Sequence, residues 1–421
     1  MAVETTHDSV STGWKPEFRK LWAASAISNL GDGVALIAAP LLAATLTRDP
    51  ALVAGLAFVQ RLPWLLFPLL SGALADRIDR QRAMVLVATL RATMIGTIGL
   101  AALLDMMSIW LLYVVFFIIS TGETLFDTAS ASVLPAIVPR DELTRANARL
   151  TGTWTVANSF IGPPLGGLLF TVAVALPFLF GAAGLAASAV LILSLRGSFK
   201  PERRNDSITT TTIWADIREG VSWLWRHRLL RTMALSLTVL NIAVIAQVSI
   251  MVLFARNQLG LGPTGFGLLL TAHATGAVLG SLAAHNVIAR FGMSTVLRTG
   301  LFIEAGVPAV IALADGPLLA GVALAVFGFH AMVWGALLTT VRQEITPDRL
   351  RGRVESVYRL LEHGAAAPGA LLGGLLATTL GLAAPFWIGA IAAAAIIPFV
   401  WSSYSEAAVN VARRALDAEA G

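Results

Sequence analysis

The sequence Gly72-Ala-Leu-Ala-Asp76-Arg77-Ile-Asp79-Arg80-Gln-Arg82 is a short charged stretch between two long apolar runs, at roughly 51–75 and 83–104. A run of about 20 apolar residues is long enough to cross a bilayer as a helix. Because charged side chains are costly in lipid, we predict that this stretch is a loop between two membrane spans, on one aqueous side of the membrane.

The composition of the whole chain also indicates a membrane protein. Of its 421 residues, 56% are hydrophobic and only 13% are charged, which is too apolar for an ordinary soluble domain. The chain has no cysteine, so disulfides and thiolate metal sites are excluded. Residues 1–18 are polar and lack the apolar core of a signal peptide, so we expect the first span to act as the insertion signal.

The apolar runs predict an all-α membrane protein with twelve transmembrane helices. They fall at roughly 19–46, 51–75, 83–104, 109–136, 148–171, 175–195, 230–256, 264–288, 294–314, 317–341, 354–378 and 381–403. Nearly all of the 30 Lys and Arg residues, Arg91 among them, are assigned to loops on the side of the termini. Only Arg48 and Arg256 are assigned to the opposite side, and Arg61 to a span. The positive-inside rule therefore predicts cytoplasmic termini in the cell membrane, and the net charge of +5 does not indicate a nucleic-acid partner.

Three short segments recur at nearly one offset, which predicts two pseudo-symmetric six-helix bundles. Gly166-Gly167-Leu-Leu recurs as Gly373-Gly374-Leu-Leu, and Gly72-Ala-Leu-Ala recurs as Gly280-Ser-Leu-Ala. Pro139 and Pro347 have the same spacing; the alternative is chance identity in a sequence rich in Ala, Gly and Leu. The predicted parts are a cytoplasmic tail (1–18), an N-terminal bundle (19–195), a linker (196–229), a C-terminal bundle (230–403) and a second tail (404–421).

The linker divides into a polar, Thr-rich stretch at 201–212 and an amphipathic segment at 214–228. In the second segment Trp and Arg alternate with apolar residues that recur every three to four positions. Such a helix is expected to lie at the membrane surface; the alternative is a regulatory partner site.

The sequence contains no G-x-x-x-x-G-K-[ST] loop, so ATP is not expected to drive the protein directly. Ionisable residues inside spans are costly and usually functional. Asp32 lies about 20 Å along the first span from Arg19, three residues after Asn29 and between two glycines. We predict that this lone carboxylate takes up and releases a proton; the alternative is a protonated or hydrogen-bonded Asp that joins the span to a neighbour.

Glu123 and Asp127 are spaced to share one face of the fourth span. Two neighbouring carboxylates cannot both ionise cheaply, so we predict that they share a proton. The pair is then a proton relay or a site for cationic substrates. The alternative is that they pair with Arg61 or Arg91 of adjoining spans.

The fifth span reads Asn158-Ser-Phe-Ile-Gly162-Pro163-Pro164-Leu-Gly166-Gly167. Prolines remove backbone donors and bend a helix, while glycines allow close packing. This predicts a hinge between the two halves. In the second half His273, Glu304 and His330 are isolated from one another in sequence; we expect packing or hydrogen-bonding roles for them, and their position relative to a cavity stays open.

The opening stretch, read as G-x-L-A-D-R-x-x-R-x-R, resembles the loop between spans 2 and 3 of the major facilitator superfamily, with Asp79 where a glycine is usual. The G-P-x-x-G-G pattern of span 5 resembles antiporters and exporters of this superfamily. D-R-I-D-R-Q-R, E-T-L-F-D-T-A and T-P-D-R-L-R-G-R-V-x-S-V-Y-R-L resemble the subgroup of enterobactin exporters and of tetracycline and macrolide efflux proteins. Many drug antiporters of the superfamily have an arginine in mid-span 4, whereas this chain has none between Arg91 and Arg140.

The resemblance covers roughly 19–403 and implies an inner-membrane exporter of amphipathic small molecules, such as a drug, siderophore or secondary metabolite. It implies proton antiport by alternating access, no enzymatic activity, no cofactor beyond the proton gradient, and a monomer. The alternatives are a proton-coupled importer of a polar solute and, from another class, a membrane sensor or scaffold that transports nothing.

The charged loop itself is predicted to be a conformational latch. In relatives the aspartate matching Asp76 faces the start of span 11, which here is 350–353. A carboxylate there is favoured by the helix terminus and by arginines; the alternative is that Asp76 only offsets neighbouring arginines. The latch residues are Gly72, Asp76, Arg77, Arg80, Arg82, Arg351 and Arg353.

Overall fold

The structure is a computed structural model that describes residues 16–67, 78–196, 199, 210–407 and 410. This part of the chain is helical and contains no strand. The first half comprises α1 (Pro16–Leu46), α2 (Pro50–Leu66), α4 (Arg80–Leu103), α5 (Ile109–Ile137), η1 (Arg140–Glu142), α6 (Leu143–Trp154), η2 (Thr155–Ile161), α7 (Gly162–Val172) and α8 (Leu176–Leu193). The second half comprises α9 (Thr210–Arg226), α10 (Arg228–Asn257), α11 (Pro263–Phe291), α12 (Met293–Ala312), α13 (Pro317–Ile345), α14 (Asp348–Leu380) and α15 (Ala384–Val400).

Ten helical segments in the described ranges are long and apolar enough to cross a membrane, with α6, η2 and α7 forming one of them. Two shorter apolar helices, α2 and α15, lie where the sequence predicts the second and the twelfth span, which is consistent with twelve spans. The chain is therefore an all-α, multi-pass membrane protein.

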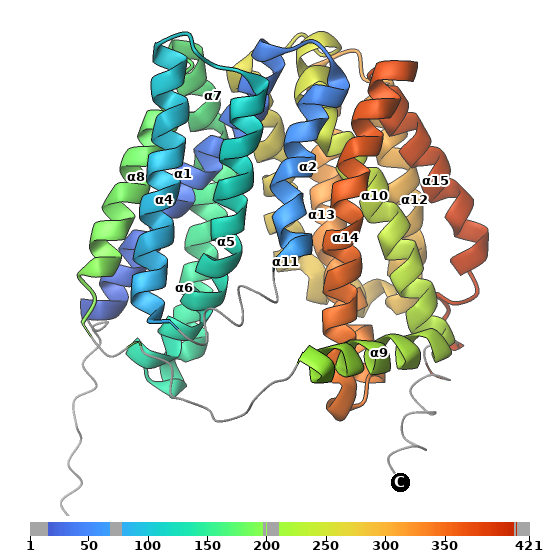
Figure 1. The fold of residues 1–421 in the computed structure, drawn as a ribbon. Coiled ribbons are helices and arrows are strands. Elements are labelled where there is room, and N and C mark those ends of the chain that lie inside the picture. The colour runs from blue at the N-terminus through green and yellow to red at the C-terminus, as the bar shows by residue number, and fades with distance from the viewer. Residues whose placement is uncertain (1–15, 68–77, 197–198, 200–209, 408–409, 411–421) are drawn as a thin grey trace, which may run out of the picture.

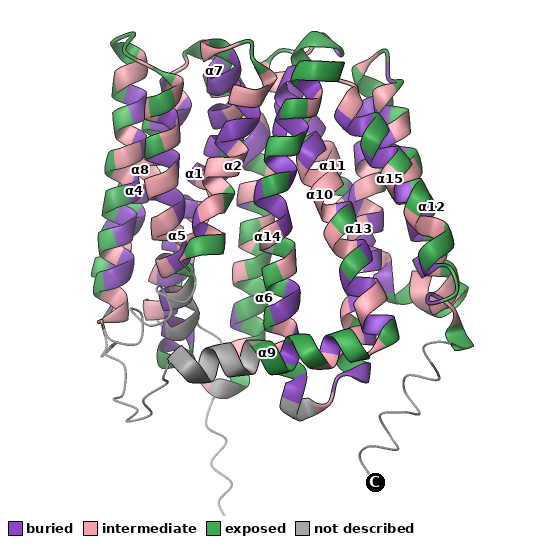
Figure 2. Ribbon diagram, turned by 45° about the vertical axis from the view of Figure 1, so that its right-hand side comes forward, coloured by how far each residue is buried: buried purple, intermediate pink, exposed green. Residues whose placement is uncertain are grey.

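The spans form two bundles that stand side by side, α1 to α8 in one and α10 to α15 in the other (Figure 1). Helix α9 lies across one end of the second bundle. We call this end of the molecule the linker end and the opposite end the far end. In Figure 2 most described residues of α9 are exposed, with Gly220 and Leu224 buried.

The repeated Gly-Gly pairs pack in corresponding ways in the two halves. A Cβ at Gly166 would meet Val34 of α1, and one at Gly373 would meet Ala246 of α10. The second glycine of each pair packs across the interface instead, Gly167 on Pro263 at the start of α11, and Gly374 on residues 50–54 of α2. Each half thus uses one glycine to hold its own first span and the next glycine to contact the other half.

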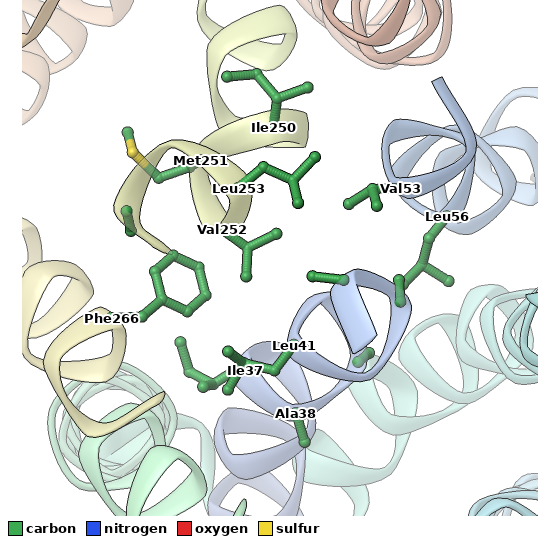
Figure 3. Packing of buried hydrophobic residues seen from close by; sticks show 14 of the residues in the cluster. Ile37, Ala38, Leu41, Val53, Leu56, Ile250, Met251, Val252, Leu253 and Phe266 are labelled. Atoms are coloured by element: carbon green, nitrogen blue, oxygen red, sulfur yellow. The ribbon is translucent and has the colours of Figure 1, made fainter. Parts of the chain in front are cut away.

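The buried apolar residues form one core that both halves share and two cores that they do not. The shared core lies toward the far end and joins α1 and α2 to α10 and α11 (Figure 3). At the linker end one cluster belongs to the first half and a separate cluster belongs to α9 and the second half. Apolar burial therefore holds the halves together at the far end.

The side-chain hydrogen bonds found between the two halves also lie at the far end. Thr378 Oγ1 donates to Asp49 Oδ1 at 3.2 Å, and Arg256 Nη1 donates to the Ala44 carbonyl at 3.0 Å. The hydroxyls of Thr171 and Thr264 lie 3.4 Å apart. The molecule is closed at the far end.

The fifth span is not one regular helix. A seven-residue π-helix, η2, ends one residue before the proline pair, and the N–H of the intervening Gly162 donates to the Ala157 carbonyl. Because Pro163 and Pro164 have no N–H, the carbonyls one turn earlier lose their usual partners. The wider π turn lies where the regular ladder is interrupted, so the irregularity begins before the prolines.

Part of the opening stretch is described, while residues 68–77 lie outside the described residues. Asp79 is the N-cap of α4, and its carboxylate accepts from the Arg82 N–H at 3.1 Å. Gln81 Nε2 donates to the carbonyls of Ile192 and Leu195 at the end of α8, at 2.8 and 2.9 Å. Asp79, which departs from the usual glycine, therefore begins the third span, and Gln81 binds the end of the sixth.

Candidate functional site

A cavity of about 620 Å³ lies inside the first bundle. It extends from Asp32 and Arg91 toward the linker end, where Leu21 and Asn147 line it. The four predicted cavity residues all line it: Asn29, Asp32, Glu123 and Asp127. Phe126, Leu150 and Trp154 add apolar and aromatic surface, so the cavity has a charged inner part and amphipathic walls.

Arg91 of α4 is the centre of the charged part. Its Nη2 donates to Asp32 Oδ1 at 2.6 Å and to Glu123 Oε1 at 2.8 Å. The arginine is only 4% exposed, whereas the carboxylate side chains are 26% and 32% exposed. One buried guanidinium therefore holds two carboxylates, from α1 and α5, at the inner part of the cavity.

This geometry corrects the prediction that Asp32 is a lone carboxylate. The alternative for span 4, in which a carboxylate pairs with Arg91, is found for Glu123. Arg91 was also wrongly assigned to a loop. It lies eleven residues after the first residue of α4, about 16 Å along the helix, and a charge that far inside an apolar run could have indicated an intramembrane position.

The two glycines beside Asp32 allow this close assembly. A Cβ at Gly31 would lie 3.4 Å from Gly181 of α8, and one at Gly33 would overlap Asn158 of η2. Asn158 Nδ2 donates to the Asn29 carbonyl at 3.4 Å, and Asn29 Nδ2 donates to the Ser25 carbonyl at 2.7 Å. Because both positions are glycine, α8 and η2 can pack directly against the segment of α1 that carries Asp32.

Asp127 lines the same cavity as Glu123, one turn away, but forms no ion pair among the described residues. Arg61 of α2 lies close enough to interact electrostatically with Glu123 and with Glu362 of α14. Three carboxylates therefore face the cavity, and one buried arginine contacts two of them. The described histidine, aspartate and glutamate side chains form no metal-binding cluster of three.

The predicted latch is only partly described. Gly72, Asp76 and Arg77 lie outside the described residues, while Arg80 donates its backbone N–H to the Phe199 carbonyl at 3.2 Å. Arg353 forms an ion pair with Glu219 of α9, and Arg351 Nη2 donates to the Gln343 carbonyl at 3.3 Å. The start of α14 is thus attached to α9 and α13.

Glu304 and His330, isolated from one another in sequence, meet in the structure and have the hydrogen-bonding role expected for them. His330 Nε2 lies 3.2 Å from Glu304 Oε1, with both side chains buried between α12 and α13. The ring of Trp334 lies 5.6 Å from that of His330. Residues 26 positions apart meet here, so their separate positions in the sequence did not indicate the pair.

The profile of the family described as transmembrane secretion effector, within the major facilitator superfamily, matches residues 12–412. The multidrug efflux pump Tap of Mycolicibacterium fortuitum is 27% identical over 378 residues, which cover 86% of this chain and 90% of the relative. The enterobactin exporter EntS of Escherichia coli O127:H6 is 30% identical over 377 residues, covering 86% and 85%.

Solved structures support the same fold at low identity. The nucleoside transporter NupG matches with a TM-score of 0.72 and 14% identity, over 93% of this chain and 99% of that one. A bacterial homologue of the iron transporter ferroportin, in an inward-facing state, matches with a TM-score of 0.72 and 17% identity, over 92% and 98%. The chain therefore belongs to the transmembrane secretion effector family of the major facilitator superfamily, and it is an efflux-type transporter rather than an enzyme.

Proposed function

We propose that this protein exports amphipathic small molecules, such as drugs or siderophores, in exchange for protons by alternating access. The observation that carries the proposal is Arg91, held between Asp32 and Glu123 beside a third carboxylate in a cavity that extends toward one end. The names of the relatives, an efflux pump and an enterobactin exporter, support the direction and substrate class.

The linker end is the cytoplasmic side in this proposal. Most of the described basic residues at or beyond the ends of the spans lie at that end, among them Arg80, Arg145 and Arg226, as the positive-inside rule requires for cytoplasmic loops. Among the described residues the halves have separate apolar cores there, and they share a core at the far end. The structure is then an inward-facing state, in which a compound enters the cavity from the cytoplasm. In this proposal the protein works as a monomer with a single transport site.

Charge balance provides the coupling. Arg91 offsets one of the three carboxylates, and Arg61 is shared between Glu123 and Glu362, so the remaining negative charge favours uptake of a proton or of a positively polarised part of a substrate. Protonation of Asp32 or Glu123 weakens the ion pair between that residue and Arg91. Arg91 then interacts mainly with the other carboxylate. Proton and substrate thus compete for one set of groups, which is the requirement for antiport.

The latch belongs to the same proposal. Asp76 contacts the start of α14 near Arg351 and Arg353 only when the cytoplasmic side closes. In the open state the arginines keep the contacts described above with α9 and α13. Closing the cytoplasmic side therefore exchanges one set of polar contacts for another.

The test begins with a susceptibility screen in a bacterial host that lacks its own efflux pumps, which identifies a protected compound. The purified protein is then reconstituted in vesicles with an imposed pH gradient. We expect uphill movement of that compound against the proton flux, abolished by a protonophore. Transport that only equalises the compound across the membrane, at a rate independent of the gradient, would rule out antiport.

A further inference from the structure

A second hollow lies on the other side of the wall formed by α1 and the α6–η2 segment. It is a groove of about 660 Å³ between residues 22–30 of α1 and residues 148–161. It shares no lining residue with the central cavity. The same two helical segments thus border the cavity with one face and the groove with another.

The groove faces the lipid. Val156 and Ile161, which line it, are 52% and 49% exposed although they belong to a membrane span. Large apolar side chains that are exposed in a membrane span are expected to contact the acyl chains of the bilayer. Most other lining residues are also apolar, so little in the groove can bind a polar solute.

The groove is deep because small residues form part of its wall. Gly152 lies in its wall, and a Cβ there would have no heavy atom within 4 Å. Ala26, Ala148 and Ala157 are also small. No packing within the described chain requires a glycine at position 152, so the space in front of it is open to a ligand.

The end of the groove nearer the linker end is cationic. The guanidinium of Arg149 lies 5.3 Å from the centre of the Trp22 ring, and Trp22 Nε1 donates to Thr153 Oγ1 at 2.6 Å. Trp22 and Arg149 are each six residues from the start of their helices, about 9 Å from that end. This is the depth of the headgroup region, where Trp and Arg are enriched.

Beyond Arg149 the groove continues toward the middle of the membrane. Ile161 is the twelfth residue after Arg149, which corresponds to roughly 18 Å along the helical axis, the dimension of an acyl chain rather than of a headgroup. Arg145 lies one helical turn closer to the membrane surface than Arg149, and an arginine fork matches phosphate geometry. A basic end and a long apolar remainder are complementary to an anionic phospholipid.

We infer that this groove binds one anionic phospholipid, with its phosphate at Arg149 and one acyl chain along Gly152 and Val156. The bound lipid covers the α1 and η2 segments that carry Asn29, Asp32 and Asn158 on their other face. It therefore stabilises the wall of the cavity from the membrane side.

The test uses the full chain in detergent and titrates dioleoylphosphatidylglycerol, with dioleoylphosphatidylcholine as the zwitterionic comparison, by native mass spectrometry. We expect the anionic lipid to bind more tightly at one saturable site. Arg149→Gln should weaken this binding about fivefold, the effect of roughly one interfacial cation. Arg290→Gln is the matched control, because Arg290 also lies over an aromatic ring at the linker end, 5.9 Å from Phe291, but lines neither the central cavity nor this groove.

Gly152→Leu tests the acyl-chain part of the site. The new side chain has space, and leucine is a better helix former than glycine, so the protein should fold with an unchanged or higher thermal midpoint while the bound lipid is lost. Wild-type binding in both variants would overturn the inference, as would equal weakening by Arg290→Gln or equal affinity for the two lipids. Displacement of the lipid by a transported compound, with direct binding of that compound dependent on Gly152, would show a substrate portal instead.

Discussion

At the scale of single residues, the decisive feature is a buried arginine with two carboxylate partners. Arg91 lies within a membrane span, where an uncompensated charge is expensive. Its ion pairs with Asp32 and Glu123 link α4 to α1 and α5. Each carboxylate is partly exposed to the cavity, so a proton or a ligand can reach it and change the balance at Arg91.

We predict that Arg91→Gln lowers the free energy of unfolding by about 3 kcal/mol. This is the lower end of the range for breaking a buried pair, because the two carboxylates are partly solvated. Adding Asp32→Asn should restore part of the loss, since contacting residues are not additive. Thermal unfolding in detergent measures both, with Arg290→Gln as the exposed control. Equal midpoints for Arg91→Gln and wild type would contradict the ion-pair account.

Asp32→Asn alone should abolish gradient-driven export, reducing its initial rate at least about tenfold, which corresponds to 1.4 kcal/mol, while substrate binding is largely kept. The asparagine amide cannot take up and release a proton, although its oxygen can still accept a hydrogen bond from Arg91. The measurement is uptake into vesicles with and without a pH gradient. Asp105→Asn is the control, because Asp105 is exposed in a loop with φ of 54° that asparagine tolerates. Full gradient-driven transport in Asp32→Asn would remove Asp32 from the coupling site.

At the scale of elements, the fifth span combines two functions in adjacent residues. Gly166 packs on α1 in its own half and Gly167 packs on α11 in the other half. The π-helix before them carries Asn158, which lines the cavity and hydrogen-bonds to α1. A displacement of α7 against α11 therefore acts on the helix turn that borders the charged site.

We predict that Gly167→Ala opens the far end. Its methyl group would overlap the Pro263 carbonyl, and overpacking of this kind costs about 1–3 kcal/mol, enough to shift a two-state ratio roughly tenfold. Spin labels at Val172→Cys and Leu318→Cys, both exposed near the far end, should show a longer component. The chain has no native cysteine to remove.

The control for this change is Gly306→Ala of α12, where a methyl group meets nothing within 4 Å. It should leave the distance distribution as in the wild type. If Gly167→Ala behaves like this control, the glycine contact does not hold the far end closed.

At the scale of the whole molecule, the distribution of buried apolar residues shows which end of the molecule is closed. One core spans both halves at the far end, and two separate cores lie at the linker end. Opening the far end requires exposure of part of the shared core, which must be offset by contacts formed at the linker end. We propose the predicted latch at Asp76 as one such contact.

Asp76→Asn should therefore favour the state that is open at the linker end and slow turnover, with the affinity of that state unchanged. A loss of about 1.4 kcal/mol would change the ratio of the two states tenfold. Spin labels at Leu193→Cys and Phe291→Cys, exposed at the linker ends of the two halves, measure the shift toward longer distances.

Asp79→Asn provides a matched control for that experiment. It removes the same charge from the same loop, and asparagine caps a helix as well as aspartate does, so the α4 terminus stays intact. Equal shifts in Asp76→Asn and Asp79→Asn would assign the effect to the net charge of the loop rather than to a latch.

The sequence alone determined the membrane class, the two repeated halves and the helix faces that carry Asn29, Asp32, Glu123 and Asp127. These features follow from local patterns, because hydrophobic length sets a span and the 3.6-residue period sets a face. The Gly-Gly repeat also indicated corresponding packing in the two halves, since close backbone approach requires glycine.

Only the tertiary structure decided that Arg91 joins Asp32 to Glu123, that His330 meets Glu304, and which end of the molecule is closed. An ion pair between helices depends on the depth and rotation of each helix relative to the others, and the ends of apolar runs are too indistinct to define either. The closed end depends on how two rigid halves divide their contacts. That choice is a small difference between two packings of the same residues, and no local pattern in the chain records it.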